Sequence, residues 1–322
     1  MALLQVLSQI PTASDIEITH EAIAPMIHRT PIFTNKSIND LCGAELFFKC
    51  ENLQKIGAFK MRGAASAALR LSDEQRARGL ATHSSGNHAQ AVALSAQLLG
   101  VPAYIVMPDV SPAIKVAATR AYQAEITLCE NNQQAREKNL ERVVAETGAY
   151  FIHPYNDYHV IAGQATAAKE LIEDAPVPLD IIIAPVGGGG LLSGTALSTR
   201  YFSAGTKVFG AEPKEVDDAW RSFTTKQRQQ NSTINTIADG LRTNLGDKTF
   251  DIILKEVDAI FTVSEAGIIQ AMRLIWERMK LVVEPSGAVP LAAILEHPAV
   301  FEGKKTGIIF SGGNVELSQL PF

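Results

Sequence analysis

Short apolar runs rich in β-branched residues alternate with longer helical patterns along most of the chain. This alternation is typical of parallel β-α-β units, and it constrains the fold more than any other feature. The run at 181–184, Ile-Ile-Ile-Ala, is apolar at every position, as expected of a strand buried on both faces. We therefore predict an α/β fold in which twisted, mostly parallel sheets are flanked by helices.

The predicted strands cover residues 45–50, 80–83, 103–107, 126–129, 180–184, 207–211, 259–263 and 306–310. The predicted helices cover residues 87–99, 112–122, 132–147, 160–174, 192–202 and 265–279. Ser264 precedes the last helix, where its hydroxyl can accept a hydrogen bond from a free backbone N–H group. A polar stretch at 224–236 is expected to be a surface loop. The length of 322 residues suits two lobes.

Four motifs combine a lysine, two polar glycine turns and a run of glycines. They are Phe59-Lys60-Met61-Arg62-Gly63, Ser84-Ser85-Gly86-Asn87-His88, Gly187-Gly188-Gly189-Gly190 and Ser311-Gly312-Gly313-Asn314. A cofactor with an aldehyde, a phosphate and a heteroaromatic ring would need an amine, a phosphate cradle and polar turns of this kind. Pyridoxal 5′-phosphate (PLP) is such a cofactor.

In this order, the four motifs resemble those of the β-family of PLP enzymes, also called fold type II. Within that family, the chain resembles serine racemase and the serine/threonine and threo-3-hydroxyaspartate ammonia-lyases, from about residue 17 to residue 316. The resemblance implies a large PLP-binding domain formed by residues 1–77 and 155–322, with a small domain, 78–154, inserted. We also expect a homodimer.

Lys60 is predicted to bond covalently to the cofactor, because a lysine amine condenses with an aldehyde. Burial can lower its pKa so that it also moves protons. Phe59 is expected to pack beside the cofactor, and Arg62 is interpreted as structural. The alternative for Lys60 is an ordinary surface lysine at the start of a helix.

Gly187, Gly188, Gly189 and Gly190 lie between a predicted buried strand and a predicted helix. Free backbone N–H groups at a helix N-terminus favour a phosphate without any lysine or arginine. The P-loop lysine and the spacing of a dinucleotide fingerprint are both missing from the sequence. Consecutive glycines are entropically unfavourable, which favours close approach of a ligand over a merely flexible turn.

The resemblance implies that Asn87 binds the phenolic oxygen of the cofactor, and that Ser84, Ser85, Asn87 and His88 surround the substrate carboxylate. Ser85 matches the serine that acts as the second acid/base in serine racemases, on the ring face opposite Lys60. A lone serine is a poor base, so it would need support from the phosphate or a neighbour. A helix-capping role for either serine is compatible with this function.

Ser311 matches the residue that faces the pyridine nitrogen in the family. A hydroxyl there leaves the nitrogen largely unprotonated, which suits β-elimination over transamination. Glu284 is expected nearby, with a structural ion pair as the alternative.

Glu212 and Asp218 fall just after a predicted strand. With the Val216 carbonyl and water, they offer the oxygen ligands that Mg²⁺ or Ca²⁺ prefers. The segment matches the divalent-ion site of serine racemase-like enzymes, for which Mn²⁺ is a further candidate. The alternative is an acidic, solvated start of a helix.

Arg136 falls where serine racemases and hydroxyaspartate ammonia-lyases carry an arginine that many threonine deaminases lack. Its guanidinium is predicted to bind a β-carboxylate or a dicarboxylate inhibitor in bidentate fashion. The alternative is an exposed helix arginine. His153 and His159 flank a loop and are interpreted as structural.

The resemblance implies an ammonia-lyase that removes water and ammonia from L-threo-3-hydroxyaspartate, L-serine or L-threonine, giving 2-oxo acids. If Ser85 returns a proton to the other face, racemisation of serine competes at the same site. The alternatives are primarily a serine racemase, a β-replacement enzyme of the cysteine synthase type, or a non-catalytic amino-acid-binding protein. The residues do not rank the three substrates.

The formal net charge is −5, with Lys and Arg spread along the chain, so no nucleic-acid partner is expected. Cys42, Cys50 and Cys129 lack CxxC or metal-ligand spacing, as expected of reduced thiols inside the cell. The sequence shows neither a signal-peptide pattern nor an apolar run long enough to span a bilayer. We therefore expect a cytoplasmic enzyme without a membrane partner.

Overall fold

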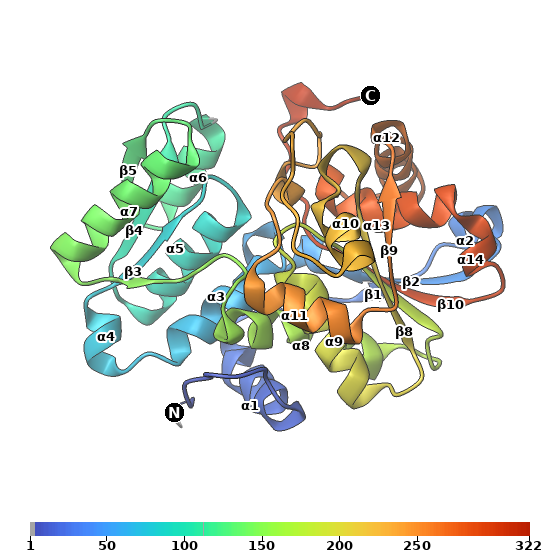
Figure 1. The fold of residues 1–322 in the computed structure, drawn as a ribbon, viewed down its shortest axis with the longest axis horizontal. Helices are drawn as coiled ribbons and strands as arrows, with labels where there is room; N and C mark the ends of the chain where they lie inside the picture. Colours follow the sequence, from blue (N-terminus) through green and yellow to red (C-terminus); the bar gives the residue numbers. More distant parts are fainter. Residues whose placement is uncertain (1–3, 112) are drawn as a thin grey trace.

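The computed structural model describes residues 4–111 and 113–322, and in these ranges it contains two β-sheets flanked by helices (Figure 1). The smaller sheet lies on the left of Figure 1 and the larger sheet on the right. None of the helices in the described ranges combines the length and the apolar character that crossing a membrane requires.

The larger sheet has the strand order β1-β2-β10-β7-β8-β9. Every neighbouring pair is parallel except β1 and β2, which are antiparallel. Its strands are β1 (Ile32–Phe33), β2 (Glu45–Cys50), β7 (Ile181–Pro185), β8 (Lys207–Pro213), β9 (Ala259–Val263) and β10 (Lys305–Phe310).

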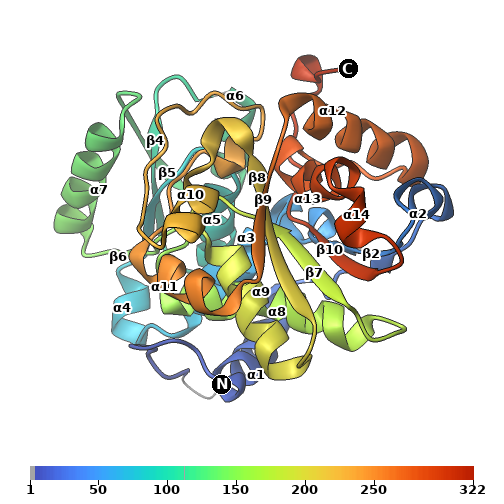
Figure 2. The same cartoon turned by 45° about the vertical axis from the view of Figure 1, so that its right-hand side comes forward.

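Two layers of helices bury this sheet on opposite faces, as Figure 2 shows for the strands β7 to β9. One layer contains α2 (Lys36–Cys42), α12 (Glu265–Leu274), α13 (Pro285–Glu296) and α14 (Pro298–Phe301). The other contains α8 (Tyr158–Asp174), α9 (Gly190–Phe202), α10 (Asp218–Thr225) and α11 (Asp247–Glu256). Ile181 and Ile183 of β7 enter the first core, whereas Ile182 and Ala184 enter the second. Because successive side chains of a strand point to opposite faces, the all-apolar run of β7 supplies both cores.

The smaller sheet is entirely parallel, with the order β5-β4-β3-β6. Its strands are β3 (Leu80–His83), β4 (Ala103–Pro108), β5 (Glu125–Cys129) and β6 (Tyr150–Phe151). One face packs against α3 (Lys60–Leu69), α5 (Asn87–Leu99) and α6 (Ala113–Ala121), and the other against α7 (Gln133–Thr147). α4 (Asp73–Ala77) also lies near this lobe, whereas α1 (Ala13–Ile23) packs mainly against α8.

α3 and α8 lie against each other at a glycine contact between the two lobes. A Cβ added at Gly163 of α8 would lie 2.4 Å from the carbonyl oxygen of Arg62 and 2.7 Å from the Cα of Gly63. Only residues without a side chain permit this approach. The contact sets the position of α3, whose first residue is Lys60.

The predicted α/β fold is confirmed, and each predicted strand is present with small differences at its ends. Several elements were not among those predicted from the sequence: the two-residue strands β1 and β6 and the helices α1, α2, α3, α4, α10, α11, α13 and α14. The helix predicted at 265–279 leaves the α conformation after Leu274 and continues as a π-helical turn, Ile275–Met279. The first residue of the helix predicted at 112–122 lies outside the described residues. The domain boundaries stay a prediction.

Candidate active site

A cleft of about 1700 Å³ contains residues of all four motifs. Three of the motifs follow directly after parallel strands: the Ser84 turn after β3, the glycine run after β7 and the Ser311 turn after β10. Ligands in open α/β sheets bind at the carboxyl ends of strands, where such loops meet. The fold thus brings together segments that are far apart in the sequence.

Lys60 is the first residue of α3, and no side chain caps the helix there. Its Nζ donates to the Pro154 carbonyl oxygen at 2.7 Å and lies 5.2 Å from the centre of the Phe59 ring. Burial lowers the pKa of the Lys60 amine to about 8, although the Glu284 carboxylate opposes this change. An amine with this pKa can release its proton near neutral pH, which fits the predicted role of Lys60.

The four-glycine run forms the N-terminus of α9, which starts at Gly190 without a side-chain cap. Gly189 has φ +89°, a conformation that favours glycine. A Cβ at Gly188 would lie 2.3 Å from the Tyr155 ring, and one at Gly187 would lie 2.9 Å from the Leu241 Cα. The backbone N–H groups of this loop have the arrangement that binds a phosphate at a helix start, so the loop fits the phosphate of PLP.

A chain of hydrogen bonds through Asn87 connects two of the motifs with Glu284. Its Nδ2 donates to Glu284 Oε1 at 3.0 Å and Oε2 at 3.1 Å, while its Oδ1 accepts from Asn314 Nδ2 at 2.8 Å. Asn314 also donates to the carbonyl oxygen of Ile56 at 2.7 Å. Burial, together with the Asp239 carboxylate, raises the pKa of Glu284 to about 7. Glu284 forms no ion pair with any described residue, so its alternative role as an ion-pair partner is wrong.

Ser84 and Ser85 both line the cleft. α5 begins at Asn87 after Gly86 and has no side-chain cap, so neither serine caps it. His88 is buried and its Nε2 lies 3.0 Å from the Ile152 carbonyl oxygen, which can only accept a hydrogen bond. The ring N–H of His88 is therefore engaged, and its backbone N–H in the first turn of α5 is the donor available to a substrate carboxylate.

Ser311 is buried beside Lys60, since its carbonyl oxygen accepts from the Phe59 N–H at 3.0 Å. The following residue, Gly312, accepts from the Glu284 N–H at 3.0 Å. These backbone bonds hold the Ser311 turn against the Lys60 segment, and Ser311 lines the cleft.

Arg136 of α7 lines the cleft from the side of the smaller sheet. Its Nε donates weakly to the Asn132 carbonyl oxygen of its own helix at 3.4 Å, and among the described residues it has no carboxylate partner. Burial, and then the positive charge of Arg136, lower the pKa of the neighbouring His83. The positively charged guanidinium group of Arg136 therefore lines the cleft and does not lie on an ordinary exposed surface.

Glu212 lies near the end of β8, and Asp218 is the first residue of α10. Both carboxylates are fully buried, so the alternative of a solvated helix start is wrong. Glu212 accepts from the Trp220 N–H at 2.5 Å, and Asp218 accepts from the Leu245 N–H at 2.9 Å. Burial raises the pKa of Glu212 well above its usual value and that of Asp218 to about 6. Two buried carboxylates without a lysine or arginine partner among the described residues fit a divalent cation.

The described residues contain no group of three or more His, Cys, Asp or Glu side chains placed to hold a metal ion. The predicted site has only two carboxylates, and its third protein ligand is the carbonyl of Val216, which lies buried between them in the chain.

Sequence reasoning missed Tyr155 and Asn314 as members of the site. Tyr155 covers the glycine run, and its ring stacks edge-on at 4.8 Å from His153. His153 lines the cleft, and burial lowers its pKa to about 4. Asn314 was visible as the last residue of its motif, but its two partners lie more than 200 residues earlier in the chain. His159 accepts from the Leu7 N–H at 2.8 Å, as expected of a structural residue.

Known proteins resemble this chain along most of its length. Residues 23–312 match the family model described as pyridoxal-phosphate dependent enzyme. The chain is 49% identical to the β-hydroxyaspartate dehydratase of Paracoccus denitrificans (strain Pd 1222), over 97% of this chain and 99% of that protein. It is 47% identical to the L-threo-3-hydroxyaspartate ammonia-lyase of Saccharomyces cerevisiae, over 96% of this chain and 95% of that protein.

The crystal structure of serine racemase from Dictyostelium discoideum is similar to this fold with a TM-score of 0.90. The two chains are 47% identical, and the match covers 95% of this chain and 99% of that one. The fold, the lysine at the cleft, the glycine cradle and the family match lead to one conclusion: the chain belongs to the family of pyridoxal-phosphate dependent enzymes.

Proposed function

We propose that this enzyme is an ammonia-lyase that removes water and ammonia from β-hydroxy amino acids, with threo-3-hydroxyaspartate as its preferred substrate. The observation that carries the proposal is Arg136, a guanidinium without a carboxylate partner among the described residues, in the wall of the cleft that contains Lys60. The names of the two relatives above, which refer to hydroxyaspartate, support this substrate.

When bound, PLP supplies an electron sink for the carbon that loses a proton. Lys60 would hold the cofactor and, with a pKa of about 8, can take the proton from the substrate Cα. The N–H groups of the glycine run would hold the phosphate, and Asn87 the phenolic oxygen. Ser311 would face the ring nitrogen with a hydroxyl rather than a carboxylate, which favours elimination.

The cleft offers separate positions for two substrate carboxylates. The uncapped N-terminus of α5, with Ser84 and Ser85 beside it, suits the α-carboxylate, because free N–H groups and the helix dipole favour an anion. Arg136 suits the β-carboxylate of hydroxyaspartate, which serine and threonine lack. This arrangement would favour a dicarboxylic substrate without excluding the smaller ones.

The substrate assignment is tested by Arg136→Ala, assayed side by side with hydroxyaspartate, serine and threonine. Loss of one partner of a desolvated bidentate pair should lower kcat/KM for hydroxyaspartate by roughly 30- to 1,000-fold. The value for threonine should change by less than about threefold. Arg142→Ala is the matched control, since Arg142 lies on the same helix but pairs with Glu146 at the surface. Equal losses for hydroxyaspartate and threonine would show that Arg136 is structural.

The role of Lys60 is tested by Lys60→Ala. We expect no release of 2-oxo acid, and a melting temperature of the cofactor-free protein close to that of the wild type. Borohydride reduction of the wild type followed by peptide mapping should place the cofactor on Lys60. Cofactor trapped on another lysine would overturn the assignment.

Serine racemisation is a second candidate activity, favoured by Ser85, which lines the cleft and has no capping role. Racemisation needs a proton donor on each face, whereas elimination from an L-substrate needs only the Lys60 face. Ser85→Ala should therefore abolish D-serine formation while elimination from L-serine falls much less. Parallel loss of both activities would count against Ser85 as the second acid/base.

We also propose that Glu212, Asp218 and the Val216 carbonyl bind Mg²⁺, with Ca²⁺ or Mn²⁺ as substitutes. Support comes from the two buried carboxylates and from their connection to the cofactor loop. The N–H of Leu245 donates to Asp218, and the Leu245 side chain packs where a Cβ of Gly189 would be. An ion at this position would thus stabilise the segment that supports the glycine run.

The ion site predicts that Mg²⁺ raises the melting temperature of the EDTA-treated protein by roughly 5 °C or more at saturation. Asp218→Asn should remove this response. Asp217→Asn is the control, because Asp217 pairs with Arg221 and should leave the response intact. A wild type whose melting temperature is the same with and without Mg²⁺ would exclude the site.

The homodimer remains a proposal drawn from the resemblance alone. Sedimentation equilibrium of the holoenzyme would test it directly.

A further inference from the structure

Arg62 lies two residues after Lys60 on α3 and is fully buried. Side chains two residues apart on a helix point to roughly opposite sides. Lys60 reaches into the cleft, whereas Arg62 points away from it, toward α8 and the end of β2. Arg62 therefore anchors the same helical turn from its far side.

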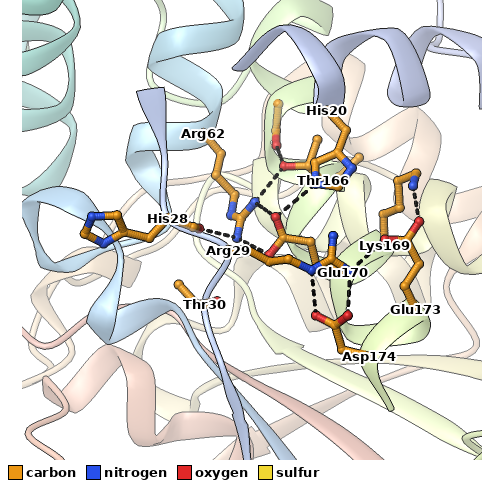
Figure 3. Close-up of polar contacts among 12 residues, drawn as sticks. His20, His28, Arg29, Thr30, Arg62, Thr166, Lys169, Glu170, Glu173 and Asp174 are labelled. Carbon is orange, nitrogen blue, oxygen red and sulfur yellow. Dashed lines mark hydrogen bonds and ion pairs between the residues drawn. The ribbon is translucent and has the colours of Figure 1, made fainter. Parts of the chain in front are cut away.

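All five N–H groups of the Arg62 guanidinium are used. Nε and Nη2 donate to Glu51 at 2.7 and 2.8 Å, and Nη1 and Nη2 donate to Glu170 at 2.8 and 2.7 Å. The remaining N–H donates to Thr166 at 3.1 Å. Figure 3 shows Arg62 directed at Glu170 and Thr166 of α8. One guanidinium thus holds two carboxylates, each with two bonds, in a fixed plane.

The partners of Arg62 are themselves held in place. Glu170 accepts from Lys49 at 2.7 Å. Glu170 also lies 3.0 Å from His20, and both are labelled in Figure 3. Burial alone would raise the pKa of the Glu170 carboxyl, but hydrogen bonds from His20 and Arg62 keep it below its usual range. Glu51 follows β2 directly, and Glu170 lies inside α8, so Arg62 ties α3 to two elements of the larger lobe.

Stability alone is a poor explanation for this network. Apolar side chains of similar volume often replace buried ion networks without loss of stability. What the network adds is a fixed orientation of the first turn of α3, which has few other constraints. It lacks a side-chain cap, and the loop that leads to it contains Ile56 in a left-handed conformation, φ +60°.

We propose that Arg62 is a positioning residue, which fixes the first turn of α3 through Glu51 and Glu170 and thereby directs the Lys60 amine into the cleft. This inference rests on the proposed role of Lys60 as the residue that binds the cofactor.

Arg62→Lys tests the proposal, because it keeps the charge and removes the bidentate fork. Lys49→Met is the matched control, since it disturbs the same buried Glu170 but leaves the bonds of Arg62 to both carboxylates. In the cofactor-free proteins, the pH dependence of Lys60 acetylation by acetic anhydride is followed by mass spectrometry. The rate at which added PLP is captured is followed by visible absorbance.

In Arg62→Lys, we expect the midpoint of Lys60 labelling to rise from about 8 toward the ordinary lysine value of 10.5, because the amine gains solvent. PLP capture should slow by roughly tenfold or more. Lys49→Met should lose thermal stability but keep the wild-type midpoint and rate. The other groups that act on the Lys60 charge, Glu284, His88 and His153, are unchanged in both variants.

An Arg62→Lys protein with a lower melting temperature but wild-type labelling and capture would show that Arg62 is only structural. If this variant does not fold, Glu51→Gln, which removes one charge at nearly constant volume, allows the same comparison. Failure of the proposed role of Lys60 would be visible separately. PLP would then be trapped on another lysine of the wild type, whereas the labelling experiment uses no cofactor.

Discussion

Glu284 links the Ser84 turn to the Ser311 turn. Its carboxyl group accepts a hydrogen bond from Asn87, and its backbone N–H donates to the Gly312 carbonyl oxygen. Burial raises its pKa from 4.5 to about 7. Between these pH values the folded protein keeps a proton that the unfolded chain loses. The resulting stability is full below about pH 4.5 and is lost as the pH rises through 7.

Glu284→Gln should therefore flatten the pH dependence of stability in the cofactor-free protein. Glu284 accounts for a decrease in the free energy of unfolding of about 3 kcal/mol between pH 4.5 and 8. The variant should be more stable than the wild type at pH 8 and similar to it at pH 4.5, as measured by urea denaturation. Glu302→Gln, at an exposed position, is the control. If the free energy of unfolding changes with pH equally in the wild type and in Glu284→Gln, Glu284 does not keep its proton when buried.

The residue types of the site could be predicted because each motif is local in sequence. The connections between them could not. Asn87 meets Glu284 across 197 positions and Asn314 across 227, and no spacing rule relates them. The bonds of Arg62 to Glu51 and Glu170 were equally invisible in the sequence, from which Arg62 was interpreted as structural.

At the scale of helices and strands, the sequence predicted what has a period or clear boundaries. The strands are short apolar runs bounded by turns, and Ser264 caps α12 as predicted through a bond to the Gly267 N–H. α3 was missed because every residue from Met61 to Leu69 is buried, which leaves no polar face to reveal a helical period. α13 is similarly buried, and Pro290 in its interior argues against a helix, although Pro285 stands at the first helical position, where proline is tolerated.

The contact between α3 and α8 predicts that Gly163→Ala is strongly destabilising. The new methyl would meet the Arg62 carbonyl and the Gly63 backbone, which cannot move without separating the helices. We expect a loss of about 1–3 kcal/mol, measured by urea denaturation. Gly86→Ala is the control, since a Cβ there has no atom within 4 Å. An unchanged midpoint for Gly163→Ala would mean that the helices are not packed this closely.

At the scale of the whole molecule, the central position of β10 was not predictable. It pairs with β2 on one side and with β7 on the other, although it follows both in the chain by more than 100 residues. Without β10, the larger sheet consists of two separate parts, β1-β2 and β7-β8-β9. The smaller sheet is different, because all of its strands come from residues 80–151.

A chain truncated before Lys305 should therefore keep the smaller sheet and lose the larger one. Hydrogen exchange measured by mass spectrometry should show protected amides in β3 and β4 and rapid exchange in β2 and β7. Full-length protein provides the reference for each peptide. Protection of β2 and β7 in the truncated chain would show that β10 does not join the two parts.

The place of β10 also has a consequence for synthesis on the ribosome. The smaller lobe can fold while translation continues, but the larger sheet waits for a strand made 154 residues after β6. At roughly 5–20 residues per second, that interval lasts about 8–30 seconds. Lys60 is translated early. Ser311, whose carbonyl oxygen accepts a hydrogen bond from the N–H of the neighbouring Phe59, is translated only after β10. PLP in the cell would therefore meet a finished site rather than guide the folding of the nascent chain.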